Sequence, residues 1–293
     1  MEHYARVDVR LWTIAAIATA LVVSACGDAD DEPHTPSSGD PGVIHIHGLG
    51  RNPADGALFI ATHTGLFRVA NSERSAERVA GLYQDTMGFT VLGADHFLGS
   101  GHPGSIENDP PFLGLIESRN AGTSWRAISL RGDVDFHVLE AQDNTVYGFG
   151  SDWDTRQARF LRSDNGGRTW TRLAPPEGLL GLAIDPQDTR VSVALGEQHG
   201  WLSTDSGRSW RPIAVPGGMT TWTPELGLIA VDLEGVIRHA SEPTGQWSEV
   251  GRLPGPPAAL EGVGDELLAA THDSRVLTSR DGGKTWRDLL NAP

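Results

Sequence analysis

An eight-residue motif that recurs four times constrains the fold of this chain more than any other feature. Each copy begins with Ser and ends with Trp, with Asp or Asn third, Gly fifth and Thr or Ser seventh. The Trp positions recur at intervals of about 40 residues, which predicts a β-propeller or another repeat array. The copies are Ser118–Trp125, Ser163–Trp170, Ser203–Trp210 and Ser279–Trp286, with a degenerate copy at Ser241–Trp247.

Each position of the motif has a physical reason. The Asp or Asn side chain accepts hydrogen bonds from turn amides, and Gly adopts backbone angles that are closed to other residues. The hydroxyl groups hold the turn, and Trp precedes the next strand and fills space between neighbouring sheets. We therefore interpret the motif as a structural turn. The residues concerned are Ser118, Asn120, Gly122, Trp125, Ser163, Asn165, Gly167, Trp170, Ser203, Asp205, Gly207, Trp210, Ser279, Asp281, Gly283 and Trp286.

Short apolar runs separated by Gly, Asp or Pro predict four strands in each repeat. The chain has 36 Gly and 18 Pro, which suits many turns. We predict an all-β, single six-bladed propeller of four-stranded antiparallel blades, starting near residues 43, 85, 134, 178, 218 and 257. Seven blades would need shorter repeats than the spacing shows. The four Trp side chains of the intact copies are expected to be buried between blades.

The N-terminus predicts export and a lipid anchor. Residues 11–25 form an uncharged apolar run, too short for a typical membrane span and suitable for a signal peptide. Small residues before the lone Cys26 resemble the bacterial lipobox, which implies lipidation of Cys26. A conventional secretory signal or a plain buried Cys is the alternative. We predict a lipoprotein signal peptide at 1–25, a lipidated Cys with a flexible acidic linker at 26–42 and a propeller at 43–293.

Charge and cysteine content exclude several classes. The formal net charge is −15, with 38 acidic and 23 basic residues, so a basic patch for nucleic acid is excluded. One Cys excludes a disulfide within the chain. The expected partners are a membrane, through the lipid anchor, and a protein or glycan ligand. The expected state is a monomer at the extracytoplasmic face of a bacterial cell membrane.

Several His residues fall at one end of the predicted blades. They lie at the starts of inner strands or in the connections between second and third strands, which share a face with the mouth of the channel. Imidazoles and carboxylates placed together bind transition metals, here zinc or copper. The alternative is that each His only hydrogen-bonds to its own loop. The candidate metal ligands are His45, His47, His63, His102, His137, Asp85 and Asp135.

The repeated motif resembles the Asp-box, or BNR repeat, of sialidases, sortilin-type receptors and photosystem assembly factors. Further segments resemble a group of bacterial exported Asp-box propellers labelled sialidase-like or glycosyl hydrolase-like. This resemblance covers nearly all of residues 43–290, and it implies fold and export more firmly than chemistry. The segments are His45–Leu49, Ala61–Phe67, Asp85–Phe89, Ser100–Pro103 and Asp135–His137.

Two functions remain open from the sequence. The first is a non-catalytic binding module for a protein, glycan or metal, acting through the face opposite the Asp-boxes. The second is a surface glycoside hydrolase. Sialidase chemistry itself is disfavoured because the chain lacks Arg-Ile-Pro and has few Tyr. The weak catalytic candidates are Asp85, Asp135, Asp152 and Tyr83.

Overall fold

The computed structural model describes residues 40–104 and 110–290, which form strands and one 3-10 turn. The predictions for residues 1–25, and for Cys26 and most of its linker, lie outside the described residues. Within the described ranges no helix has the length and apolar character needed to cross a membrane.

The strands of the first three blades cover residues 46–173. Blade 1 contains β1 (Ile46–Arg51), β2 (Leu58–Thr62), β3 (Gly65–Val69) and β4 (Glu77–Arg78), followed by the 3-10 turn Val79–Gly81. Blade 2 contains β5 (Asp85–Gly93), β6 (His96–His102), β7 (Leu115–Ser118) and β8 (Arg126–Ser129). Blade 3 contains β9 (Val134–Gln142), β10 (Thr145–Asp152), β11 (Ala158–Ser163) and β12 (Thr171–Leu173).

The other three blades follow in the same order. Blade 4 contains β13 (Gly181–Ile184), β14 (Ser192–Leu195), β15 (His199–Ser203) and β16 (Arg211–Pro216). Blade 5 contains β17 (Met219–Thr223), β18 (Gly227–Val231), β19 (Val236–Ala240) and β20 (Ser248–Arg252). Blade 6 contains β21 (Pro257–Val263), β22 (Glu266–Thr271), β23 (Val276–Ser279) and β24 (Arg287–Asp288).

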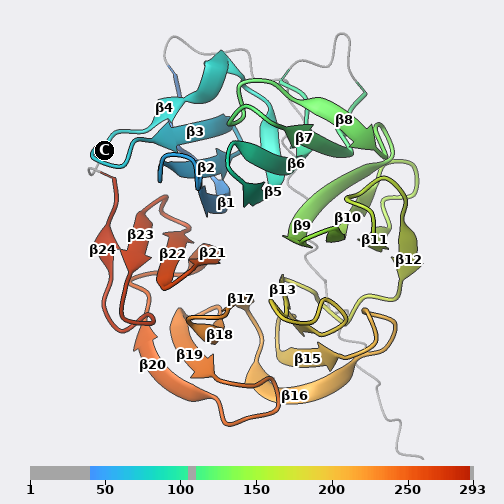
Figure 1. Cartoon of the computed structure of the whole chain (residues 1–293), viewed down its shortest axis with the longest axis vertical. Helices are drawn as coiled ribbons and strands as arrows, with labels where there is room; N and C mark the ends of the chain where they lie inside the picture. The colour runs from blue at the N-terminus through green and yellow to red at the C-terminus, as the bar shows by residue number, and fades with distance from the viewer. Residues whose placement is uncertain (1–39, 105–109, 291–293) are drawn as a thin grey trace, which may run out of the picture. The chain divides into compact units, whose positions relative to one another are not determined.

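Each blade is an antiparallel sheet of four consecutive strands, and the six sheets form a closed ring (Figure 1). The first strand of each blade lies innermost, and it contacts the first strand of the next blade around the channel. Blade 6 closes directly onto blade 1. The predicted six-bladed propeller is therefore confirmed.

The core is divided into six apolar clusters, one between each pair of neighbouring blades. Between blades 1 and 2, for example, the ring of Phe97 packs edge-on against two others. Its centroid lies 4.8 Å from that of Phe59 and 5.5 Å from that of Phe89. Alternation along the strands places these rings on the sheet faces, where burial removes apolar area from water. Packing between blades thus holds the ring together.

The motif Trp residues pack between blades as predicted, but each is half-buried and not buried. Each indole covers the edge of a cluster shared with the preceding blade; Trp170, for example, contacts the cluster between blades 2 and 3 and lies 5.3 Å from Phe136. Each Trp comes immediately before the outer strand of its blade, and part of each indole stays exposed to solvent. Trp170 also donates a hydrogen bond from Nε1 to Ser129 at 2.9 Å.

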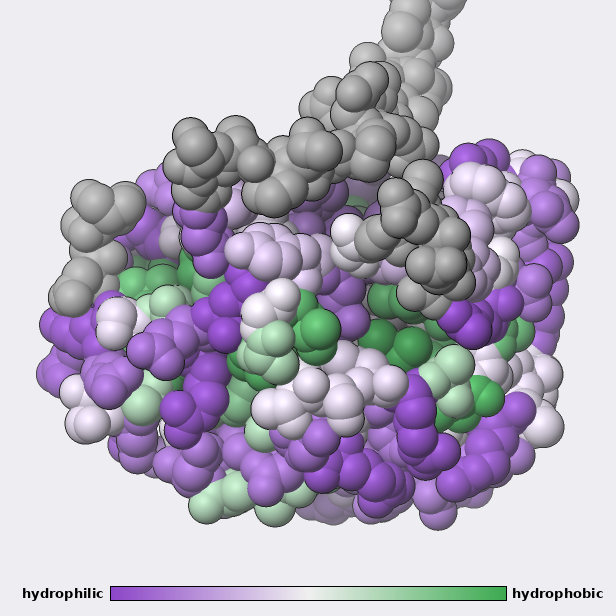
Figure 2. All heavy atoms as spheres, turned by 90° about the horizontal axis from the view of Figure 1, so that it is seen from above, coloured by the Kyte–Doolittle hydropathy of each residue, from purple (hydrophilic) through white to green (hydrophobic). Residues whose placement is uncertain are grey.

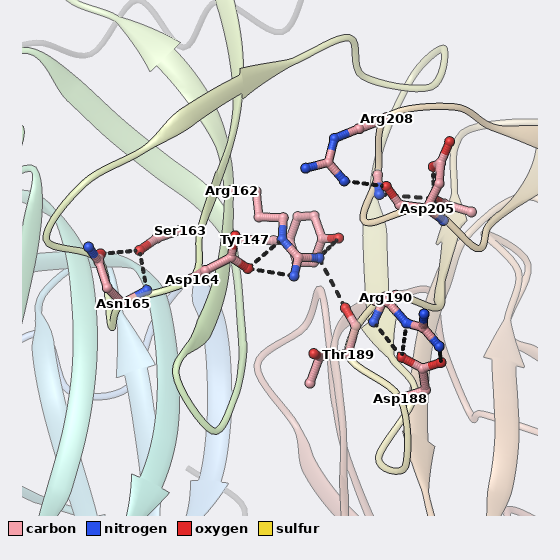
Figure 3. Close-up of polar contacts among 12 residues, drawn as sticks. Tyr147, Arg162, Ser163, Asp164, Asn165, Asp188, Thr189, Arg190, Asp205 and Arg208 are labelled. Atoms are coloured by element: carbon pink, nitrogen blue, oxygen red, sulfur yellow. Dashed lines mark hydrogen bonds and ion pairs between the residues drawn. The ribbon is translucent and has the colours of Figure 1, made fainter.

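The four repeated turns connect the third strand to the outer strand in blades 2, 3, 4 and 6. In the blade 3 copy, the hydroxyl of Ser163 donates to the side-chain oxygen of Asn165 at 2.9 Å (Figure 3). The same hydroxyl accepts from the amide of Gly167 at 2.9 Å. Gly167 has φ +79, and a Cβ there would lie 2.0 Å from Leu115 Cδ2. Both the backbone conformation and the close approach therefore require glycine at this position.

A buried arginine ties blade 3 to blade 4. Arg162 donates to the hydroxyl of Tyr147 at 2.6 Å and to the backbone oxygen of Thr189 at 3.0 Å (Figure 3). Asp164 accepts two further hydrogen bonds from the same guanidinium. The Tyr147 side chain is fully buried, so its hydroxyl serves the interface between blades.

The junction of blades 1 and 6 carries an ion pair. Arg51 donates from Nε and Nη2 to the two carboxylate oxygens of Glu266 at 3.0 and 2.9 Å. A bidentate pair of this kind fixes geometry as well as charge. On the side of the ring seen in Figure 2, the surface is mainly hydrophilic and the apolar residues form smaller patches, as expected for a chain rich in acidic residues.

Candidate functional site

Six side chains gather at one end of blades 1 to 3, where the inner strands begin. Because strand direction alternates within a blade, the start of the first strand lies at the same end as the connection from the second strand to the third. His47, Asp85, Asp135 and His137 come from inner strands, His63 from the turn after β2 and His102 from the end of β6. This group, here called the mouth cluster, comprises His47, His63, Asp85, His102, Asp135 and His137.

Three members of the mouth cluster converge on one point. One ligand atom each from His47, His63 and Asp85 lies within 4.8 Å of the other two. Nδ1 of His63 is 2.9 Å from Asp85 Oδ2, and Nε2 of His47 is 3.6 Å from Asp85 Oδ1. The last two atoms are buried and make no hydrogen bond within the described part of the chain. The arrangement offers two imidazoles and one carboxylate to a single cation.

The other three members continue the cluster toward blade 3. Nδ1 of His102 lies 3.3 Å from Asp85 Oδ2, and its Nε2 lies 3.3 Å from Asp135 Oδ2. Nε2 of His137 is 3.0 Å from the same Asp135 oxygen. Both carboxylates are buried, whereas the two imidazoles are partly exposed. A carboxylate on each side of His102 suits the imidazolium form, with both N–H groups donating.

The pKa shifts divide the imidazoles by role. Burial lowers the pKa of His47, so its neutral, metal-ligating form is favoured. Burial alone would also lower the pKa of His102, but hydrogen bonds to Asp135 and Asp85 outweigh it and raise that pKa to about 10. His102 is therefore charged at neutral pH and links two carboxylates, whereas His47 is available to a metal.

The same balance acts on the acids and on His137. Burial would raise the pKa of Asp85 and of Asp135, but hydrogen bonds from the neighbouring imidazoles outweigh it and lower both values. For His137, the opposing effect of burial is outweighed by its hydrogen bond to Asp135, which raises the pKa. Both aspartates are therefore carboxylates at neutral pH, as cation ligands must be.

Bulges in the inner strands set the position of two imidazoles. In β1, Ile46 pairs with Thr62 and Gly48 with Ala61, so His47 is the extra residue of a bulge. In β9, His137 occupies the corresponding place between two paired residues. A bulge re-aims a side chain and is common next to functional sites. Both imidazoles line the central channel.

Residues two apart in one strand share a face, but His45 and His47 do not lie in one strand. His45 precedes β1 and has φ 48, outside the extended conformation that alternation requires. Its exposed ring lies 6.0 Å from the ring of His63, beside the cluster, and its backbone oxygen accepts a hydrogen bond from the His63 amide. His45 supports the turn that carries His63.

Two weak catalytic candidates are engaged elsewhere. Asp152 accepts hydrogen bonds from the amide and hydroxyl of Thr155 and pairs with Arg159, so it holds its own loop. Tyr83 is exposed, and its ring lies under the guanidinium of Arg78, 4.0 Å from the carbon to the ring centroid. Neither makes a hydrogen bond or ion pair to the mouth cluster among the described contacts.

The channel below the mouth cluster holds a cavity of about 180 Å³. Glu140 on β9 and Glu261 on β21 both line it. Burial raises the pKa of Glu261 to about 8, and burial together with Glu261 raises that of Glu140. Sequence reasoning missed this pair. The available signal was a Glu near the end of the predicted inner strand in two blades.

Comparison with known proteins gives limited similarity. No protein-family model matches the chain. It is 28% identical over 160 residues to xyloglucanase Xgh74A of Acetivibrio thermocellus, a match covering 50% of this chain and 18% of the enzyme. It is 29% identical over 69 residues to vacuolar protein sorting/targeting protein 10 of Phaeosphaeria nodorum, covering 22% and 5% respectively. The chain therefore spans less than a fifth of these relatives.

Solved structures share the fold across most of the chain. A GH74 xyloglucanase from Xanthomonas campestris matches with a TM-score of 0.57 and 19% identity, covering 87% of this chain and 46% of the enzyme. A gluconolactonase from the same organism, XC5397, matches with a TM-score of 0.63 and 13% identity, covering 81% of this chain and 86% of that protein. YCF48 bound to D1 peptide matches with a TM-score of 0.53 and 16% identity, covering 85% of this chain and 82% of that protein. At these identities the likeness shows a β-propeller and no particular chemistry.

Proposed function

We propose that this chain is an exported metal-binding propeller that holds a transition-metal ion, zinc or copper, at the mouth of its channel. The observation that carries the proposal is the convergence of His47, His63 and Asp85, with ligand atoms within 4.8 Å of one another. Two imidazoles and a carboxylate form a donor set that zinc and copper accept.

Burial strengthens this interpretation. Nε2 of His47 and Oδ1 of Asp85 are buried and have no hydrogen-bond partner in the described structure. A buried polar atom without a partner destabilises a fold by about 1–3 kcal/mol. A cation at this point would satisfy both atoms. Three protein ligands would leave a coordination position for water or for a donor from a bound molecule.

The neighbouring residues support such a site from outside. His102 contacts Oδ2 of Asp85, whereas His47 faces Oδ1, and His102 also connects Asp85 to Asp135, which in turn contacts His137. Groups that orient metal ligands in this way raise metal affinity by roughly 10- to 100-fold. The cluster therefore has ligands and the contacts that would fix them.

The test is metal content and affinity. Full-length protein carrying Cys26→Ser, so that its one thiol does not bind metal, should take up one equivalent of zinc or copper. His47→Ala should reduce the affinity at least tenfold. The matched control is His96→Ala. His96 lies at the end of β6 far from the mouth cluster, and its Nε2 is 2.8 Å from Oε1 of Glu117 on β7. Absence of stoichiometric metal in the parent protein would refute the proposal.

The location is part of the same proposal. Lipidation of Cys26 and the acidic linker that follows would hold the propeller at the extracytoplasmic face of a bacterial cell membrane. The supporting observation is the apolar run of residues 11–25 that ends at the chain's one Cys. Cys26→Ser should remove the lipid mass and either release the protein from the membrane fraction or leave its signal peptide uncleaved. Unchanged fractionation and mass would exclude the anchor.

A surface glycoside hydrolase is the second candidate. It is supported by the similarity to a xyloglucanase and by Glu261, whose raised pKa suits a general acid. The cavity of about 180 Å³ is smaller than the roughly 300–1,000 Å³ of typical small-molecule sites, so the binding function is favoured. Xyloglucan oligosaccharides, aryl glycosides and an aryl sialoside would test it. Turnover that Glu261→Gln abolishes would support hydrolysis.

A further inference from the structure

Corresponding positions of three neighbouring blades carry His, Met and His. The inner strand of blade 1 has its bulge at His47, and that of blade 3 at His137. In β5 of blade 2, Thr86 pairs with Gly101 and Gly88 with Ser100, so Met87 is the extra residue. The bulge thus recurs at the same place in blades 1, 2 and 3, and the same bulge in blade 6 carries Ala258, which offers no side-chain donor atom.

The bulge residues of blades 1, 2 and 3 line the same cavity. His47, Met87 and His137 all contribute to the wall of the central channel, and β5 contacts both β1 and β9. Met87 therefore stands between the two imidazoles around the ring. His47 and His137 are also near enough to influence each other electrostatically.

Methionine in this position is not explained by core packing. The protein has three Met residues, and the two beyond Met1, Met87 and Met219, both line the cavity. Met219 packs against the apolar cluster between blades 5 and 6. Met87 is half-buried and belongs to none of the six clusters of the described chain.

We infer that the metal is copper, and that the Met87 thioether joins the His47 imidazole as a ligand of Cu(I). Thioether and imidazole donors together suit Cu(I), whereas zinc gains nothing from a thioether. The inference rests on the proposed metal function and names its metal. His47 belongs both to the group with His63 and Asp85 and to the cavity wall that carries Met87, so one ion bound by His47 is the ion that Met87 would reach.

The experiment compares Cu(I) with Zn(II) in the full-length chain carrying Cys26→Ser. Cu(I) affinity is measured in ascorbate against bicinchoninate, and Zn(II) affinity against a chromophoric chelator. Met87→Leu nearly conserves the side-chain volume. This variant should lower the affinity for Cu(I) at least tenfold and change the affinity for Zn(II) less than threefold. Met219→Leu is the matched control and should change neither. His47→Ala should weaken both.

X-ray absorption of the Cu(I) complex tests the same ligand without relying on a variant. With the only Cys removed, a copper–sulfur shell in the parent protein can come only from Met, and Met87→Leu should remove it. Equal Cu(I) affinity in Met87→Leu, or a spectrum without sulfur, would overturn the copper inference and leave the metal function standing. Failure of the parent protein to bind either ion would overturn both.

Discussion

The carboxylates of Asp85 and Asp135 are joined by a single imidazole, that of His102, which lies 3.3 Å from each. Asp85 begins β5 and Asp135 lies near the start of β9, so the imidazole links the inner strands of two neighbouring blades. Both carboxylates are buried, and two buried like charges without a cation between them would repel. The positive imidazole makes the arrangement stable and gives it a dependence on pH.

His102 should stabilise the metal-free fold at neutral pH and lose this effect in alkali. Its pKa is raised to about 10 in the folded state, against about 6.5 in an unfolded chain. Protonation therefore favours folding, fully below about pH 6.5, and the contribution declines as pH rises toward 10. His102→Gln should lower Tm at pH 6.5, and the difference from the parent protein should shrink by pH 10. The measurement is thermal unfolding in chelator across this range.

The control for this pH series is His199→Gln. His199 is exposed and packs beside Trp201, away from the mouth cluster. Its substitution should leave Tm within about 1 °C at every pH. A constant difference between the parent protein and His102→Gln from pH 6.5 to 10 would contradict the charged bridge.

Metal should remain bound in mild acid. Burial lowers the pKa of His47, and hydrogen bonds from His102 and His63 lower that of Asp85 against the effect of burial, so both keep their ligating forms below the usual range. Metal binding lowers such values further. We expect most of the metal to be retained at pH 6 and released at more acid pH, as followed with a metal-sensitive dye. Complete release by pH 6.5 would contradict this assignment.

Trp170→Ala should lower the free energy of unfolding of the propeller by about 2–3 kcal/mol. This is less than the roughly 3–5 kcal/mol lost when a fully buried aromatic residue is replaced by Ala. The indole is half-buried, packs beside Phe136 and donates a hydrogen bond to Ser129. Urea unfolding of the parent protein and the variant measures the change. Trp170→Phe should recover part of the loss, because it keeps the packing without the N–H. A loss under about 0.5 kcal/mol would mean that the rim Trp contributes little.

Two adjacent glycines of one repeated turn separate backbone strain from steric clash. Gly166 and Gly167 both have positive φ, but a Cβ at Gly166 meets only the end of Arg168, at 3.3 Å, whereas at Gly167 it meets Leu115 at 2.0 Å. Gly166→Ala should lower the free energy of unfolding by about 1 kcal/mol through backbone strain. Gly167→Ala should lower it by at least about 2 kcal/mol more, because the core side chains must move. Equal losses in urea unfolding would contradict the clash.

The repeat made the architecture predictable, because one motif at a fixed interval marks the same connection in successive blades. Burial of Trp170 could not be predicted to the same degree. The motif places this indole before an outer strand, but how far other side chains cover it depends on packing between neighbouring blades, which no single repeat contains.

The candidate site was predictable in composition and not in detail. The placement of His47, His63 and His102 at one end of the blades follows from strand direction alone. The bulges do not, because one extra residue in a strand leaves no clear trace in the hydrophobic pattern. They explain why Met87 drew no attention, whereas His45 departs from alternation because it precedes β1 with φ 48.

Every blade of the described chain uses four consecutive strands, so no sheet is shared between the first blade and the last. The ion pair of Arg51 with Glu266, the hydrogen bond from Arg74 to the backbone oxygen of Asp288 and the apolar cluster between the two blades hold that junction without strand pairing. Blades 1 and 6 could therefore separate without breaking any pair of hydrogen-bonded strands. The mouth cluster, confined to residues 47–137, does not cross that junction. Ring opening at the junction would leave its donor atoms together, so ligand retention and ring closure are separable properties of this molecule.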